Sequence, residues 1–290
     1  MSISSDFIKI IEEISNYFKF PPIKEIITPQ GNDYFKKQNF SAIILEDNTV
    51  GLIFTNLNPM IKEKLRSRDF TKFQKLETIE LIKLFKSKDL FEKSLALGCI
   101  NAISQFILRM VDFSFDFTTD SLGLLNIKST DTIGMVGFFP PLVKLIEKVG
   151  SELIIIEKKE ELVQTTDNWS VTLDPSKLKK CNKILITGTT VLNESLDEIL
   201  LHCTSAEKAS VIGPTTSFLP DPLFERGIDV IGGSYVVDVG SLKIAIEKNL
   251  RWGDSVRKYT IEKKNYVGYR DLLLTFIDSK NADKLSIKRN

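Results

Sequence analysis

The sequence has too few histidines and cysteines for most soft-metal sites. A single histidine, His202, occurs in 290 residues, which excludes any multi-histidine metal site. It lies near the C-terminus of a predicted helix, where the helix dipole favours a structural cation over a catalytic group. The cysteines Cys99, Cys181 and Cys203 have no paired spacing, which favours a reducing compartment over a disulfide framework. We therefore expect a cytoplasmic protein.

The sequence also lacks a strong net charge and a long apolar run. The 39 lysines and arginines against 38 aspartates and glutamates leave a net charge of +1, so no global field attracts nucleic acid or a membrane surface. No apolar run approaches the roughly 20 residues of a membrane span. Residues 1–18 carry acidic residues at helical spacing, which is not typical of a signal peptide. We expect a small-molecule ligand, and the choice between monomer and homodimer stays open.

The common nucleotide motifs are incomplete. No lysine follows the glycines as in a phosphate-binding loop, which argues against nucleoside triphosphate hydrolysis. Gly134 and Gly137 have the spacing G-x-x-G, and Pro140 stands where the last glycine of a dinucleotide fingerprint belongs. Glu157, however, occupies the position about 20 residues further on where such folds bind a ribose. NAD or S-adenosylmethionine therefore remains an alternative cofactor.

The segment 131–157 reads as one strand–loop–helix–strand unit. An apolar run over 132–136 predicts the first strand, and Pro140 with Pro141 marks the start of a helix that Gly150 ends. The continuous apolar run that closes the segment is typical of a strand buried on both faces. Such a unit predicts free backbone N–H groups at its loop, and these favour an anion.

The chain divides by its hydrophobic patterns into an α+β part and an α/β part. Residues 1–110 show strands followed by helices, including a predicted hairpin of strands 40–46 and 49–55 and a helix over 90–110. We treat 111–130 as a linker. Strands and helices then alternate over 131–252, which predicts a doubly wound parallel sheet, with Asp221 and Asp238 as helix N-caps. The tail, 253–290, is predicted to be helical in part.

Glycines and hydroxyl side chains gather where the predicted parallel strands end. The carboxyl ends of parallel strands open on the same side of a sheet, so these loops are expected to form one ligand-binding rim. Backbone N–H groups at Gly137, Gly188 and Gly213 are expected to point at a shared ligand. The candidate binding residues are Gly134, Gly137, Phe138, Phe139, Pro140, Glu157, Gly188, Thr189, Thr190, Gly213, Pro214, Thr215, Thr216, Gly232, Gly233 and Asp238.

Four segments at these loops resemble a known family. They are LGCINAISQ (97–105), GMVGFFPPLV (134–143), LITGTTVLNESLDEIL (185–200) and VIGPTTSFLPDPLFERGIDVIGG (211–233). The chain is similar over about residues 5–250 to the putative heavy-metal chelation domain family. The resemblance implies a Rossmann-like domain that follows a smaller domain similar to the N-terminal domain of enolase. It also implies a ligand cleft between the two domains, with Asn101 and Ala102 on the smaller domain's side.

The resemblance leaves the activity and the ligand open, and whether the protein is an enzyme is not decided. Its name suggests metal handling, but soft metals prefer the cysteine and histidine that this chain lacks. A divalent metal is therefore expected to arrive inside an organic chelator or to be held by oxygens. The favoured hypothesis is binding of a small anionic or metal-chelating metabolite. The alternatives are an enzyme that uses NAD or S-adenosylmethionine, and a scaffold with a vestigial cleft.

Overall fold

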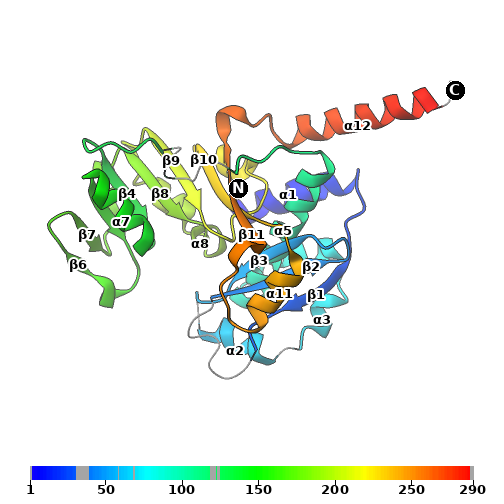
Figure 1. The fold of residues 1–290 in the computed structure, drawn as a ribbon, viewed down its shortest axis with the longest axis horizontal. Helices are drawn as coiled ribbons and strands as arrows, with labels where there is room; N and C mark the ends of the chain where they lie inside the picture. Colours follow the sequence, from blue (N-terminus) through cyan, green and yellow to red (C-terminus); the bar gives the residue numbers. More distant parts are fainter. Residues whose placement is uncertain are drawn as a thin grey trace.

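The computed structural model contains two sheets with helices packed on them (Figure 1). It describes residues 2–30, 39–57, 59–67, 69–117, 122 and 125–287, so residues 118–121 and 123–124 of the predicted linker lie outside the described part. The smaller sheet has three antiparallel strands, and the larger has eight strands that are mostly parallel. The mixed α/β class expected from the sequence is confirmed.

The first part of the chain forms the small sheet and the helices around it. The sheet order is β1-β2-β3, and the hairpin of β2 and β3 pairs Phe40 with Phe54 at its open end. The hairpin and the long helix α5 are found where the sequence predicts them. The elements are α1 (Ile3–Ser15), β1 (Ile23–Ile27), β2 (Phe40–Leu45), β3 (Val50–Phe54), α2 (Pro59–Ser67), α3 (Thr71–Gln74), α4 (Thr78–Lys83), η2 (Leu84–Lys86) and α5 (Leu90–Met110).

The second part forms the large sheet, whose order is β11-β10-β9-β8-β4-β5-β7-β6. The sheet grows in both directions from β4, as doubly wound folds do. The elements are β4 (Thr132–Val136), α7 (Pro140–Val149), β5 (Glu152–Ile156), η3 (Glu160–Leu162), β6 (Gln164–Thr165), β7 (Trp169–Thr172), η4 (Pro175–Lys180), β8 (Lys183–Thr187), α8 (Thr189–Leu192), α9 (Leu196–Leu200), β9 (Lys208–Ile212), α10 (Asp221–Phe224), β10 (Val230–Val236), α11 (Val239–Glu247), η5 (Gly253–Ser255), β11 (Val256–Glu262), η6 (Lys263–Asn265) and α12 (Tyr269–Ile287).

Residues after 252 do more than form a helix. The strand β11 pairs antiparallel with β10 from Val230–Glu262 to Val236–Val256, and the sequence patterns do not predict this strand. The helix α12 follows it and projects from the top of the molecule (Figure 1). In the part of the chain that the structure describes, no helix combines the length and the apolar character needed to cross a bilayer.

The two predicted N-caps have different outcomes. Asp238 caps α11, and its Oδ1 accepts a hydrogen bond from the Ser241 N–H at 3.0 Å. Asp221 does not cap α10, because Pro220 occupies the N-cap position. The buried Asp221 carboxylate instead accepts hydrogen bonds from the Tyr269 N–H at 2.9 Å and the Tyr266 hydroxyl at 2.7 Å. A buried carboxylate needs such partners, and here they fix the start of α12.

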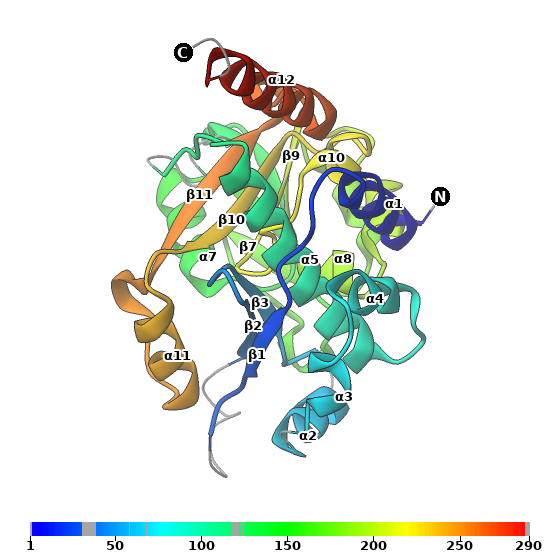
Figure 2. The same ribbon diagram turned by 90° about the vertical axis from the view of Figure 1, so that its right-hand side faces the viewer.

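The helix α5 lies between the small sheet and the rest of the molecule (Figure 2). It is buried from Lys93 to Leu108 and contacts β2 and β3 on one side and α8 on another. It approaches β3 so closely that a Cβ added at Gly51 would lie 1.9 Å from the Gly98 carbonyl oxygen. The largest hydrophobic cluster continues from α1 and α5 into the large sheet, so both sheets share one core.

This close approach makes Gly51 intolerant of a methyl group. We expect Gly51→Ala to lower the free energy of unfolding by about 3 kcal/mol, the upper end for overpacked sites, because the clash is with backbone. Gly240→Ala is the matched control, since its added Cβ meets only the Asp238 Oδ1, at 3.5 Å. Denaturant unfolding of both variants tests this, and equal stability of Gly51→Ala and wild type would contradict it.

A buried ion pair joins the start of β4 to the start of β8. The Lys183 Nζ lies 2.7 Å from the Asp131 Oδ2, and both side chains are less than a tenth exposed. Burial raises the pKa of Asp131, but hydrogen bonds from Lys183, Asn182 and the Lys128 N–H outweigh burial and lower it to about 2. The pair therefore stabilises the edge at which the parallel strands begin.

The stability that Asp131 contributes should depend on pH. A carboxyl group whose pKa falls from 3.8 to about 2 on folding stabilises the protein above about pH 4, and this contribution disappears as the pH falls towards 2. We expect a loss of about 1–2 kcal/mol over that window in wild type. In Asp131→Asn this pH-dependent loss of stability should be absent, whereas the control Asp254→Asn, at an exposed position, should retain it. Denaturant unfolding between pH 2 and 5 measures the difference, and identical profiles would refute the assignment.

Candidate functional site

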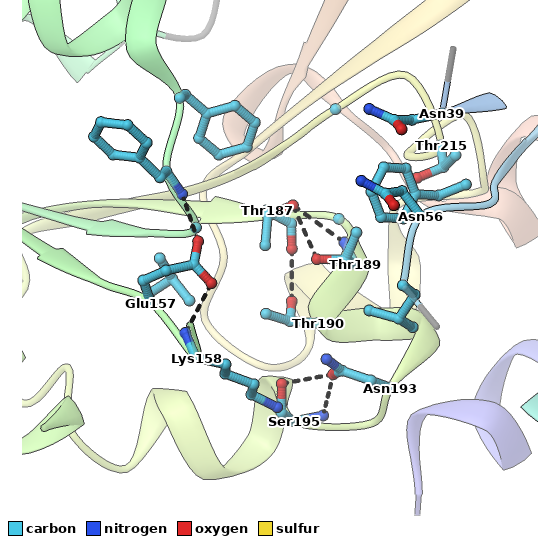
Figure 3. Close-up of a pocket in the computed structure, with 18 of the residues that line it drawn as sticks. Asn39, Asn56, Glu157, Lys158, Thr187, Thr189, Thr190, Asn193, Ser195 and Thr215 are labelled. Carbon is cyan, nitrogen blue, oxygen red and sulfur yellow. Dashed lines mark hydrogen bonds between the residues drawn. The ribbon is translucent and has the colours of Figure 1, made fainter. Parts of the chain in front are cut away.

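A cleft of about 480 Å³ lies at the carboxyl ends of β4, β5, β8 and β9 (Figure 3). The opposite wall comes from the open end of the β2–β3 hairpin and the residues that flank it. The cleft is thus formed by loops of the large sheet on one side and by the small sheet on the other. The hairpin and its flanking residues contribute Asn39, Phe40, Phe54, Asn56 and Leu57.

The topology explains why the cleft forms there. The parallel strands follow the order β7-β5-β4-β8-β9-β10, which in order of appearance is 3-2-1-4-5-6. Connections from β4 and β8 leave in opposite directions, so a crevice opens between their carboxyl ends, and doubly wound folds bind ligands at this position. The loops that begin at Gly137 and Gly188 border this crevice.

The structure brings together the glycine loops that the sequence predicts to share a rim. Gly137, Gly188 and Gly213 all line the one cleft, although up to 76 residues separate them, as 213 − 137 = 76. The other predicted candidates that line it are Phe138, Phe139, Glu157, Thr189, Thr190, Pro214 and Thr215.

Seven predicted candidates lie elsewhere, in positions with a packing or hydrogen-bonding role. A Cβ at Gly134 would lie 2.7 Å from the Leu178 Cδ2, and one at Gly233 would lie 2.6 Å from the Tyr259 ring. Thr216 is buried, and its hydroxyl contacts the Gly213 and Gly232 carbonyls at 2.6 and 2.5 Å. The remaining four are Gly232 in β10, Pro140 at the start of α7, Asp238 at the N-cap of α11 and Asn101 inside α5.

Asn101 acts from behind the cleft wall. It is fully buried, and its Nδ2 donates to the Leu52 carbonyl of β3 and to the Thr215 carbonyl, each at 3.1 Å. Thr215 lines the cleft, so Asn101 fixes a lining residue without touching the cavity.

The predicted role of the glycine N–H groups requires correction. The Gly137 N–H donates to the Ile156 carbonyl, the Gly188 N–H to the Ile212 carbonyl, and the Gly213 N–H to the Gly232 carbonyl. Each is therefore used by the end of the neighbouring strand and is not directed at a ligand. Gly137 is needed for its left-handed backbone (φ 90°), and Gly188 for its close approach to Thr216.

The start of α7 does not form a pyrophosphate cradle. Pro140 and Pro141 have no N–H group, and the Phe138 N–H donates to the Glu157 Oε2 at 3.2 Å. The other carboxylate oxygen of Glu157 accepts from the Lys158 N–H at 2.7 Å. The Phe138 N–H is thus paired with a protein carboxylate, whereas Rossmann folds use N–H groups of this loop to bind a dinucleotide phosphate. This arrangement disfavours NAD as the ligand.

Hydroxyl and amide groups form the polar surface of the cleft (Figure 3). The Thr187 and Thr189 hydroxyls lie 3.1 Å apart, and the Thr190 hydroxyl donates to the Thr187 carbonyl. Among the described residues, no hydrogen-bond partner is found for the side-chain amides of Asn39 and Asn56, so both are available to a ligand.

Sequence patterns miss several lining residues. Phe40 and Phe54 end the β2–β3 hairpin, and Asn39, Asn56 and Leu57 flank it. Nothing in their local sequence shows which surface these residues will face. A further group lies at or after the strand ends of the large sheet, next to predicted candidates, and extending each loop by a few residues in both directions would have found it. Its members are Thr187, Asn193, Ser195, Lys158 and Lys159.

Direct coordination of a soft metal finds little support in this cleft. In the described residues, no group of three or more histidine, cysteine, aspartate or glutamate side chains is arranged to hold a metal ion. The cysteines lie outside the cleft, and burial raises the pKa of Cys181 to about 12 and of Cys203 to about 11. A metal ligand must be the thiolate, which such pKa values disfavour.

Comparisons with solved structures agree with this fold. A protein of unknown function from Pyrococcus horikoshii superimposes with a TM-score of 0.65 at 18% identity and covers 90% of this chain and 99% of its own. A second, from Desulfitobacterium hafniense DCB-2, gives 0.63 at 20% identity and covers 89% and 99%. At these identities the likeness concerns the fold alone.

Comparisons of sequence define the family. An uncharacterized protein of Methanocaldococcus jannaschii is 28% identical over 236 residues, which are 77% of this chain and 86% of that protein. Two family models, each described as putative heavy-metal chelation, match residues 33–104 and 120–263. These matches include the hairpin, most of α5 and the strands around the cleft. The chain belongs to the putative heavy-metal chelation family.

Proposed function

We propose that the cleft binds a small, oxygen-rich anionic metabolite that chelates a metal ion, and that the metal reaches the protein inside this chelator. The observation that carries the proposal is that three glycine loops and the end of the small sheet enclose one cavity at the topological switch point. Its volume of about 480 Å³ falls in the range of small-molecule sites.

The lining residues match an organic ligand better than a bare ion. Phe40, Phe54, Phe138 and Phe139 provide apolar surface, and threonine hydroxyls and asparagine amides provide a few oriented polar groups. Apolar walls with a small number of placed polar groups are the usual composition of a metabolite pocket.

The charges in the cleft favour an anion. Among the residues that the structure describes, Lys158 and Lys159 line it together with a single acid, Glu157. Both Glu157 oxygens already accept hydrogen bonds from backbone N–H groups, so its negative charge is partly compensated. Two lysines at the cleft therefore support carboxylate or phenolate oxygens on the ligand.

The metal part of the proposal rests on the family description together with the chemistry of the lining. Hydroxyls, amides and lysines bind oxygen anions well, but they do not replace the carboxylates, imidazoles and thiolates that hold metal ions. A chelator that satisfies the metal and leaves its outer oxygens to the protein fits both observations.

Iron(III) citrate is a suitable probe, with citrate alone, nickel chloride alone, NAD and S-adenosylmethionine as comparisons. A ligand that binds only the folded state, at a concentration of about 100 times its Kd, raises the free energy of unfolding by about 2.7 kcal/mol. This corresponds to a rise of roughly 5 °C in Tm for a protein of this size. We expect this shift with iron(III) citrate and no shift with nickel chloride. Isothermal titration calorimetry then gives the affinity. A Tm shift with NAD or S-adenosylmethionine alone would favour the nucleotide alternative and overturn the proposal.

Substitution of the two cleft lysines tests the proposed site directly. The double substitution Lys158→Ala and Lys159→Ala should weaken iron(III) citrate binding on the order of a hundredfold, because each charged hydrogen bond that is lost contributes roughly 1.5 kcal/mol and a tenfold change in affinity corresponds to about 1.4 kcal/mol. Lys179→Ala with Lys180→Ala removes an equally adjacent pair outside the cleft and should leave the affinity unchanged. Equal affinities for the two double variants would count against the proposed site.

A further inference from the structure

A three-residue turn at the rim of the cleft is held from outside the cleft. Asn193 and Ser195 line the cavity, and the Asn193 Oδ1 accepts hydrogen bonds from the Ser195 N–H at 3.1 Å and hydroxyl at 2.6 Å (Figure 3). Glu194, between them, is not a lining residue. Its backbone is left-handed (φ 57°), a conformation that glycine and asparagine adopt far more easily than glutamate.

The Glu194 carboxylate reaches two helices of the first part of the chain. Its Oε1 accepts a hydrogen bond from the Ser4 hydroxyl of α1 at 2.7 Å. Its Oε2 accepts one from the Lys93 Nζ of α5 at 2.5 Å. Ser4 is 2% exposed and Lys93 is 8% exposed, so both partners approach Glu194 from the protein interior.

These contacts keep the Glu194 carboxylate in its charged form. Burial raises the pKa of Glu194, but the hydrogen bonds from Lys93 and Ser4 outweigh it and keep the pKa below its ordinary value, so the carboxylate stays ionised at neutral pH. A buried ammonium group that loses its carboxylate partner is strongly disfavoured. Because α5 also packs against α8, which directly precedes the turn, the turn is fixed relative to α5.

We propose that Glu194 is a positioning residue for the cleft: its bonds to Ser4 and Lys93 set the conformation of the turn that presents Asn193 and Ser195. The cleft wall at the end of β8 therefore depends on how α1 and α5 dock against it. The helix α5 also packs against the small sheet. The effect on ligand affinity rests on the proposed function, whereas the effect on the turn does not.

A second group of ion pairs, between α1 and the second part of the chain, supplies the control. Arg226 bridges the Asp6 carboxylate of α1 and the Asp197 carboxylate of α9, each at 2.7 Å. Asp6→Asn therefore removes an ionic contact between α1 and the second part of the chain without touching the turn. It separates the role of Glu194 from general loosening of α1.

The first experiment is hydrogen–deuterium exchange on the ligand-free protein. In Glu194→Gln we expect backbone amides over residues 188–196 to exchange at least tenfold faster than in wild type, with the core strands unchanged. In Asp6→Asn these amides should keep wild-type rates. Glu194→Gly is a second variant in which the left-handed backbone is easy, and it should show the same faster exchange because the carboxylate is gone.

The second experiment is calorimetric titration with iron(III) citrate. We expect Glu194→Gln to bind about tenfold more weakly than wild type, and Asp6→Asn to bind as wild type does, since supporting contacts of this kind commonly change affinity by such factors. If wild type does not bind iron(III) citrate, the proposed function fails for this probe, and exchange alone decides the role of Glu194. Wild-type exchange rates in both Glu194 variants, or equal acceleration in Asp6→Asn, would overturn the inference.

Discussion

The cleft depends on one buried amide group. The Asn101 Nδ2 in α5 donates at once to the Leu52 carbonyl of the small sheet and to the Thr215 carbonyl at the end of the large sheet. A buried amide that loses its partners is costly, so α5 has one preferred position between the two sheets. Gly51 and Gly98 allow the close approach that this position requires. The same helix carries Lys93, so it fixes the loops after both β8 and β9.

The sequence predicts the central strands well because their information is local. The strands β4, β5 and β8 each have an apolar centre and are followed by glycine or polar residues, as is typical of strands buried on both faces. The strand β11 has exposed Arg257 and Lys258 and is identified only by its pairing with β10. The four residues of β7 are likewise too short to show a period. Their assignment comes from tertiary contacts.

The rim of the site was predictable for a topological reason, but its chemistry was not. Parallel strands place their carboxyl ends together, so Gly137, Gly188 and Gly213 meet once the strands are assigned. Whether their N–H groups are free depends on how far the neighbouring strand extends. In this chain the carbonyls of Ile156 and Ile212 lie within reach of two of them. Likewise Asn39 and Asn56 become lining residues through the docking of the small sheet, which no local pattern encodes.

The different roles of backbone and side chains at the cleft affect which ligands it can distinguish. The N–H groups of Gly137, Gly188 and Gly213 are occupied in holding strand ends together. The side chains that these loops and the small sheet present to the cleft include amides, hydroxyls and two lysines, and we expect them to recognise the ligand. Such groups distinguish ligands by the arrangement of oxygens and negative charge, not by the softness of a metal ion. Under the proposed function, the chelator therefore selects the metal and the protein selects the chelator. Metals carried by the same chelator in the same geometry would then be bound alike.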